Sequence, residues 1–155
     1  MLLTIFGAIL GFLFCLCLQP LLQDRVNAFL ASTLPPQIFR GSTSLAGTWT
    51  QLWSVANPGY PPGQPSDAPI HQFLNHVYGR FSFDGRTYQL AGKISGHFLT
   101  GHWEDIQSGH TYHGSFQLRI FPNANHMEGV WVGWGTDGTI KHGQWTWTRN
   151  GTSTA

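Results

Sequence analysis

The sequence has little cysteine and little charge, and both shortages narrow its possible functions. Cys15 and Cys17 are its two cysteines, and both lie in an apolar N-terminal run. The rest of the chain therefore offers no disulfide framework and no cysteine-based zinc site. Charged residues make up 10% of the 155 residues and the formal net charge is +1. This balance argues against a DNA or RNA polymer as partner.

Recognisable catalytic motifs are also missing. The seven acidic residues form no paired-acid arrangement, and there is no nucleophile elbow or phosphate loop. We therefore expect no enzymatic activity and no cofactor. The eight histidines show no H-x-x-x-H or H-E-x-x-H spacing, so we expect surface or pocket histidines and no metal site.

The N-terminus is rich in apolar residues. Leu2–Leu18 is apolar apart from one threonine, and about twenty such residues span a bilayer. Residues 1–22 are therefore predicted to form a transmembrane helix. A cleaved signal peptide is the alternative, but no basic residue precedes the run and no good cleavage site follows it. Gly7 and Gly11 have the spacing that favours self-association of membrane helices, although glycine is also common in such helices generally.

Residues 23–44 are predicted to contain an amphipathic juxtamembrane helix and a linker. Leu21–Ala31 places its apolar residues on one helical face, which is typical of a helix at the membrane surface; a continuation of the membrane helix is the alternative. The nearest basic residues, Arg25 and Arg40, follow the span and none precedes it. The positive-inside rule then places the C-terminal part in the cytoplasm.

A short motif recurs through the remaining chain, with a glycine followed two residues later by an aromatic residue. In a strand these two positions share a face, so we expect each pair to point inward in a small, tightly curved sheet. The pairs are Gly47/Trp49, Gly79/Phe81, Gly96/Phe98, Gly101/Trp103, Gly114/Phe116, Gly129/Trp131 and Gly143/Trp145.

Residues 45–150 are predicted to form an all-β domain, with a polar tail at 151–155. Alternation of apolar residues and tight-turn signals predict seven strands: Leu45–Val55, Val77–Phe83, Thr87–Ser95, His97–Asp105, Tyr112–Phe121, Met127–Trp134 and Lys141–Arg149. Sequential hairpins of this kind favour an up-and-down antiparallel barrel of about eight strands; an open β-sandwich is the alternative.

Two stretches depart from this simple alternation. Asn57–Pro69 contains five prolines, so we expect a long loop rather than an inner strand. Met127–Trp134 is apolar on both faces, because Val130, Val132 and Trp134 alternate with the motif residues. Such a pattern is compatible with a strand that is covered on both sides.

Ligand binding is the remaining functional hypothesis. Aromatic rings stack on bases and arginines bind phosphates, but we expect the tryptophans to pack the lumen of the barrel. A ligand would then meet the barrel at its mouth or outer face. The candidate ligand-binding residues are Tyr60, Arg80, Tyr88, Tyr112, Arg119 and Arg149.

Two resemblances follow from these features. The stretch Leu45–Leu52 (LAGTWTQL) resembles the opening strand of lipocalin- and avidin-like barrels. The layout as a whole, a membrane-spanning N-terminus joined by a short linker to a minimal barrel, resembles the transmembrane β-barrel effectors of bacterial cyclic-oligonucleotide antiphage signalling (CBASS). Such effectors commonly have two membrane helices, whereas this chain has one clear span.

The second resemblance implies a specific function. It implies a single-pass protein of the inner membrane whose barrel faces the cytoplasm and binds a cyclic dinucleotide. Binding would drive homo-oligomeric assembly and disruption of the membrane lipid. A membrane-tethered lipocalin-like carrier of a small or hydrophobic ligand, or an anchored scaffold domain, is the alternative.

Overall fold

The computed structural model describes residues 29, 43–55, 63–83, 85–107, 112–135 and 138–151. The predicted span at 1–22, Gly7 and Gly11 within it, and Tyr60 lie outside the described residues, as do most of 23–44 and of the tail. Within the described ranges, no helix has the length and apolar character needed to cross a bilayer.

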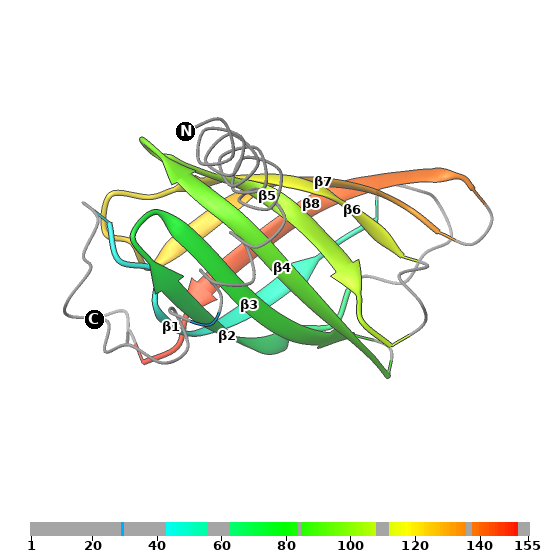
Figure 1. Cartoon of the computed structure of the whole chain (residues 1–155), viewed down its shortest axis with the longest axis horizontal. Helices are drawn as coiled ribbons and strands as arrows, with labels where there is room; N and C mark the ends of the chain where they lie inside the picture. Colours follow the sequence, from blue (N-terminus) through cyan, green and yellow to red (C-terminus); the bar gives the residue numbers. More distant parts are fainter. Residues whose placement is uncertain are drawn as a thin grey trace, which may run out of the picture.

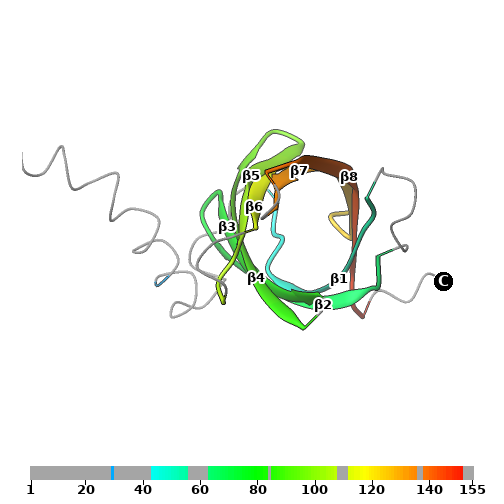
Figure 2. The same ribbon diagram turned by 90° about the vertical axis from the view of Figure 1, so that its right-hand side faces the viewer.

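Eight antiparallel strands form a closed barrel (Figure 1). Each strand pairs with its neighbours in the sequence, and β1 pairs with β8 to complete the ring seen end-on in Figure 2. This confirms the predicted up-and-down barrel and excludes the open sandwich. The strands are β1 (Gly47–Trp53), β2 (Ser66–Phe73), β3 (His76–Phe83), β4 (Arg86–Ser95), β5 (Phe98–Asp105), β6 (His113–Ile120), β7 (His126–Trp134) and β8 (Ile140–Arg149).

Alternation along the strands places one continuous core inside the ring. In β6, for example, Gly114, Phe116, Leu118 and Ile120 are buried, while the residues between them are exposed. Trp49 and Trp147, on the paired strands β1 and β8, are also fully buried. The aromatic and aliphatic side chains that the alternation predicted to point inward therefore supply the burial that stabilises the barrel.

Close approach of neighbouring backbone explains four of the recurrent glycines, Gly101, Gly114, Gly129 and Gly143. A Cβ atom on Gly143 would lie 1.6 Å from the carbonyl oxygen of Ser54, and one on Gly129 would lie 1.9 Å from that of Gln117. No side chain fits where the backbone of another segment already lies. At these four positions the glycine therefore permits close approach of the neighbouring backbone, while the aromatic residue two positions later fills the lumen.

One pair of the motif does not point inward. Gly96 lies in the turn between β4 and β5 with a φ of 58°, and Phe98 is an exposed residue on the outer face of β5. The prediction was wrong here because the rule that positions i and i+2 share a face applies within a strand. Leu99, one residue further, is the buried residue.

The prediction for the region of strand β2 was also wrong. The sequence predicted a loop up to Pro69, but β2 begins at Ser66 and includes this proline. Pro69 pairs with Thr48 of β1, whereas the β2–β3 ladder begins only at Ile70. A residue without an N–H group is therefore tolerated where the strand is paired on one side.

The outer face of β7 is not covered by the described residues, unlike the two-sided burial that the sequence pattern allowed. The apolar pattern was compatible with a strand covered on both sides, but Val130 and Trp134 are exposed large apolar residues. They lie on the outside of a barrel wall, and the described part of the chain does not bury them. The inner residues of the same strand, Met127 and Trp131, are buried in the core.

Candidate ligand-binding site at the barrel mouth

A cavity of about 460 Å³ lies at one end of the barrel. It is the end at which β1 and β7 finish and β4 and β8 begin. Aromatic side chains predominate in its wall, joined by two cationic side chains. The lining residues are Trp53, Val55, Gly63, Gln64, Phe83, Arg86, Tyr88, Trp103, Tyr112, Trp131, Gly133, Trp134, Gly135 and Lys141.

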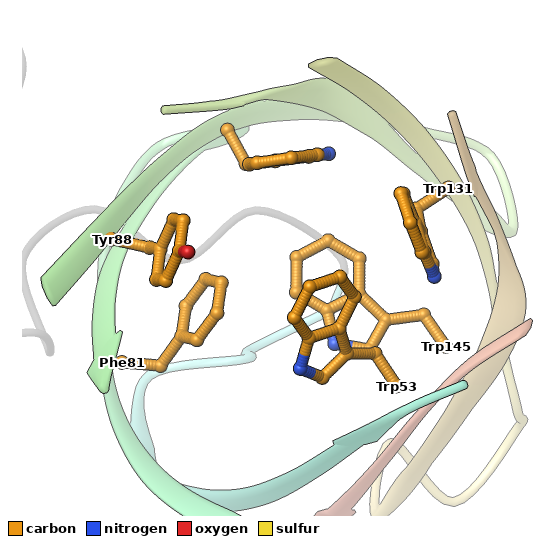
Figure 3. Close-up of a pocket in the computed structure, with 6 residues that line it drawn as sticks. Trp53, Phe81, Tyr88, Trp131 and Trp145 are labelled. Carbon is orange, nitrogen blue, oxygen red and sulfur yellow. The ribbon is translucent and has the colours of Figure 1, made fainter. Parts of the chain in front are cut away.

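The floor of this cavity is a cluster of aromatic rings that fills the middle of the lumen. Figure 3 shows Trp53, Phe81, Tyr88, Trp131 and Trp145 pointing into the barrel from different strands. The ring centroids of Trp53 and Trp131 are 4.8 Å apart, and Phe81 stacks on Tyr88 at 5.2 Å. The cluster, which also includes Trp103, leaves a gap of only about 10 Å³. The tryptophans therefore fill the lumen as the sequence indicated, and open space remains at the mouth.

The indole N–H groups of this cluster are not all hydrogen-bonded. Trp131 Nε1 donates to the Ser54 carbonyl at 2.9 Å, and Trp145 Nε1 donates to Gln51 Oε1 at 2.7 Å. By contrast, the buried Nε1 atoms of Trp53 and Trp103 have no hydrogen-bond partner among the described residues. A buried donor without an acceptor lowers the stability of the fold by about 1–3 kcal/mol. Trp53 and Trp103, which also line the mouth, each carry such a donor.

In one wall of the mouth, Arg86 and Asp105 form a hydrogen-bonded pair. Arg86 Nη1 donates to Asp105 Oδ2 at 3.0 Å, and the carboxylate also accepts from the backbone N–H of Gln107 at 2.8 Å. The Arg86 guanidinium lies 4.8 Å from the centroid of the Tyr112 ring, within cation–π range. Its hydrogen bond to Asp105 raises the pKa of Arg86, so the group stays cationic at any physiological pH.

The two cations of the mouth lie on opposite walls. Arg86 is the first residue of β4 and Lys141 the second of β8. In a ring of eight strands taken in sequence order, β4 and β8 are as far apart as two strands can be. A ligand in this cavity would therefore meet a positive side chain on each side and aromatic rings below.

The predicted ligand-binding residues are divided among three places. Tyr88 and Tyr112 line the mouth cavity. Arg80 and Arg119 are exposed on the outside of β3 and β6, away from the cavity. Arg149 lies at the opposite end of the barrel, where β8 finishes.

Arg149 is held by the chain itself. Its guanidinium donates to the carbonyls of Ser44, Ala46 and Ala124 at 2.7, 2.7 and 3.2 Å. It also lies 4.7 Å from the centroid of the Trp49 ring. Burial lowers the pKa of Arg149. These contacts connect the start of β1 with the β6–β7 turn and close this end of the barrel.

Arg86, Lys141 and Asp105 were not among the residues predicted from the sequence to bind a ligand. The sequence pattern that could have identified them is the alternation of inward and outward positions along a strand. Each lies two residues beyond a predicted inward residue of its own strand, namely Tyr88, Gly143 and Trp103. Extending the alternation by one step points these charged residues into the end of the barrel. Among the described residues, no group of three or more potential ligands is placed to hold a metal ion.

The fold and the cavity define a closed eight-stranded antiparallel barrel with an aromatic, cationic mouth. No protein-family model and no curated protein matches the chain. Among solved structures, a tryptophan-to-alanine mutant of the vaccine antigen Transferrin Binding Protein B (TbpB) from Haemophilus parasuis Hp5 is similar at 15% identity, with a TM-score of 0.43. The match covers 66% of this chain and 25% of that one, so the chain spans about a quarter of the other's length.

Proposed function

We propose that this protein is a membrane-anchored sensor and effector whose barrel binds a cyclic dinucleotide at its mouth. The observation that carries the proposal is the cavity of about 460 Å³, with an aromatic floor and a cation on each of two opposite walls. Cavities of about 300–1,000 Å³ are typical of sites for small organic ligands. The surroundings offer the two kinds of contact that nucleotides use.

A cyclic dinucleotide suits this arrangement because it carries two phosphates and two planar bases on one ring. Bases stack on aromatic side chains, and phosphates pair with arginine and lysine. Arg86 on β4 and Lys141 on β8 would each meet one phosphate, while a base would pack on Trp53 or Trp134. The architectural resemblance to antiphage effectors makes this class of ligand the first to test.

The proposed response to binding is assembly in the inner membrane. The ligand would favour the assembled state only if it bound that state more tightly than the isolated one. Homo-oligomers would then bring the N-terminal spans together and disrupt the lipid bilayer. On this proposal the barrel lies in the cytoplasm, where a nucleotide signal is produced.

Calorimetric titration of the full-length protein in lipid nanodiscs with a panel of cyclic dinucleotides tests the proposal. We expect at least one of them to bind, and we expect Lys141→Met to weaken its binding about tenfold, as loss of a charge-assisted contact does. Arg80→Met, which removes an exposed cation of the outer wall, is the matched control. Absence of binding by every cyclic dinucleotide contradicts the proposal.

A carrier of an apolar ligand is the second candidate, and the predominance of aromatic residues in the cavity wall favours it. Such a carrier would bind neutral aromatic compounds as well as anionic ones, and it would lie outside the cytoplasm. A topology reporter fused after Ala155 separates the two proposals. Activity of a reporter that works only in the periplasm would favour the carrier.

A further inference from the structure

The Arg86–Asp105 pair is unequally exposed, and this asymmetry bears on how the mouth recognises a ligand. The Asp105 side chain is 0% exposed, whereas that of Arg86 is 37% exposed. An exposed ion pair contributes little to stability, but a fully buried carboxylate needs its partners. The buried member is therefore the fixed part of the pair, and the arginine is the part that faces the cavity.

Asp105 is held from several directions. Its Oδ1 atom accepts from the Gln107 N–H, and its own backbone N–H donates to the Tyr112 carbonyl at 2.8 Å. The neighbouring turn is connected back to β4 because Gln107 Oε1 accepts from the Thr87 N–H at 3.3 Å. These bonds connect the first residues of β4, the end of β5 and the start of β6 to one another.

We propose that Asp105 and the Tyr112 ring position Arg86 as the anion-binding group of the mouth. This inference rests on the proposed function, since it identifies the residue of the site that binds the anionic group of a ligand. A guanidinium hydrogen-bonded on one side and seated on a ring has lost much of its rotamer freedom before the ligand arrives. A ligand therefore avoids part of the ordering cost that a mobile arginine would impose.

The proposal defines a ligand class. The ligand has planar rings that pack on the aromatic floor, and an anionic group that points toward β4. Asp105 does not touch the ligand in this scheme and acts through Arg86.

Two fluorescent probes that differ in one group test the inference. Anilinonaphthalene sulfonate and N-phenylnaphthylamine have the same ring systems, but only the first carries an anionic group. Binding is measured on the full-length protein in lipid nanodiscs by energy transfer from tryptophan, with empty nanodiscs as the blank. All seven tryptophans lie at or beyond Trp49, so the signal originates in the barrel.

We expect Arg86→Met and Asp105→Asn each to weaken binding of the sulfonate about tenfold, the loss expected for one charge-assisted contact, and to leave binding of the neutral probe unchanged. Combining the two substitutions is expected to cost no more than Arg86→Met alone, because Asp105 acts through the arginine. Arg80→Met is the matched control and is expected to change neither affinity.

Retained binding of the neutral probe shows that a variant is folded. Equal losses for both probes, or tighter binding of the sulfonate by Asp105→Asn, would overturn the inference, since a carboxylate that only repels the ligand gives the second result. If neither probe binds the wild-type protein, the proposed site itself is wrong. If Asp105→Asn does not fold, Tyr112→Leu decides: a loss confined to the sulfonate supports the inference, and unchanged selectivity overturns it.

Discussion

Arg149 has the chemistry of a phosphate-binding residue, but in this structure its side chain stabilises the fold. An arginine near aromatic rings has the properties of a phosphate contact, and this was the reason for predicting it as a ligand-binding residue. In the structure its guanidinium donates to three main-chain carbonyls and lies over Trp49. The same donors that would bind a phosphate are used to close one end of the barrel.

We expect Arg149→Ala to lower the free energy of unfolding by about 2–4 kcal/mol, because charge-assisted bonds to carbonyls and a cation–π contact are lost together. Urea denaturation monitored by tryptophan fluorescence measures this change. Arg80→Ala, on the exposed face of β3, is the control and is expected to change stability by less than about 0.5 kcal/mol. Equal effects of the two substitutions would contradict a closing role for Arg149.

The strands β8, β1 and β2 are connected inside the lumen as well as through their backbones. Gln51 of β1 is fully buried; its Oε1 accepts from Trp145 Nε1 of β8, and its Nε2 donates to Ser66 Oγ of β2 at 2.8 Å. Pairing of β1 with β8 joins the two ends of the strand series. A buried glutamine with both ends bonded therefore stabilises the closure on which the barrel depends.

We expect Gln51→Leu to destabilise the protein by about 1–3 kcal/mol, because Trp145 Nε1 is left buried without an acceptor. Adding Trp145→Phe removes the orphaned donor, and we expect the double variant to lose less than the sum of the two single variants. Denaturant unfolding gives the four free energies. Strict additivity would show that the hydrogen bond does not stabilise the seam.

At the scale of the whole molecule, the barrel is one part of a chain whose N-terminal segment is predicted to cross a membrane. The described residues contain a filled lumen, a mouth cavity at one end and an arginine-closed opposite end. On the proposed function, the mouth detects a ligand and the N-terminal span reports it by assembly. Of the exposed apolar residues of β7, Val130 lies on the outer wall, whereas Trp134, at the end of the strand, borders the mouth cavity.

The predicted role of the membrane helix is tested by Gly7→Leu. A large side chain at a position of the small-residue pair prevents close approach of two helices, so we expect a lower proportion of oligomer at the same protein-to-lipid ratio. Cross-linking in membranes measures it, with Ala8→Leu on a different face of the helix as the control. An unchanged proportion of oligomer in Gly7→Leu would remove helix packing from the proposed mechanism.

Much of the barrel was predictable from the sequence because its determinants are local. Alternation over five to ten residues, glycine beside an aromatic residue, and Asp-Gly turns indicate seven of the eight strands and most of their inward faces. Strand β2 was missed because a proline in a strand depends on which neighbours pair with it, and pairing is not visible in a local pattern. Phe98 was misplaced because a turn interrupted the alternation.

The sequence by itself determined a small antiparallel barrel with an aromatic interior and identified Tyr88 and Tyr112 among its candidate ligand-binding residues. Only the tertiary structure decided which end of the barrel holds the cavity. Closure of β1 onto β8 places Arg86 and Lys141 on opposite walls of one cavity and carries Arg149 to the other end. Residues far apart in the chain become neighbours through strand register, so three arginines of similar sequence character acquire different roles: Arg80 in solvent, Arg86 in the mouth and Arg149 in the closed end.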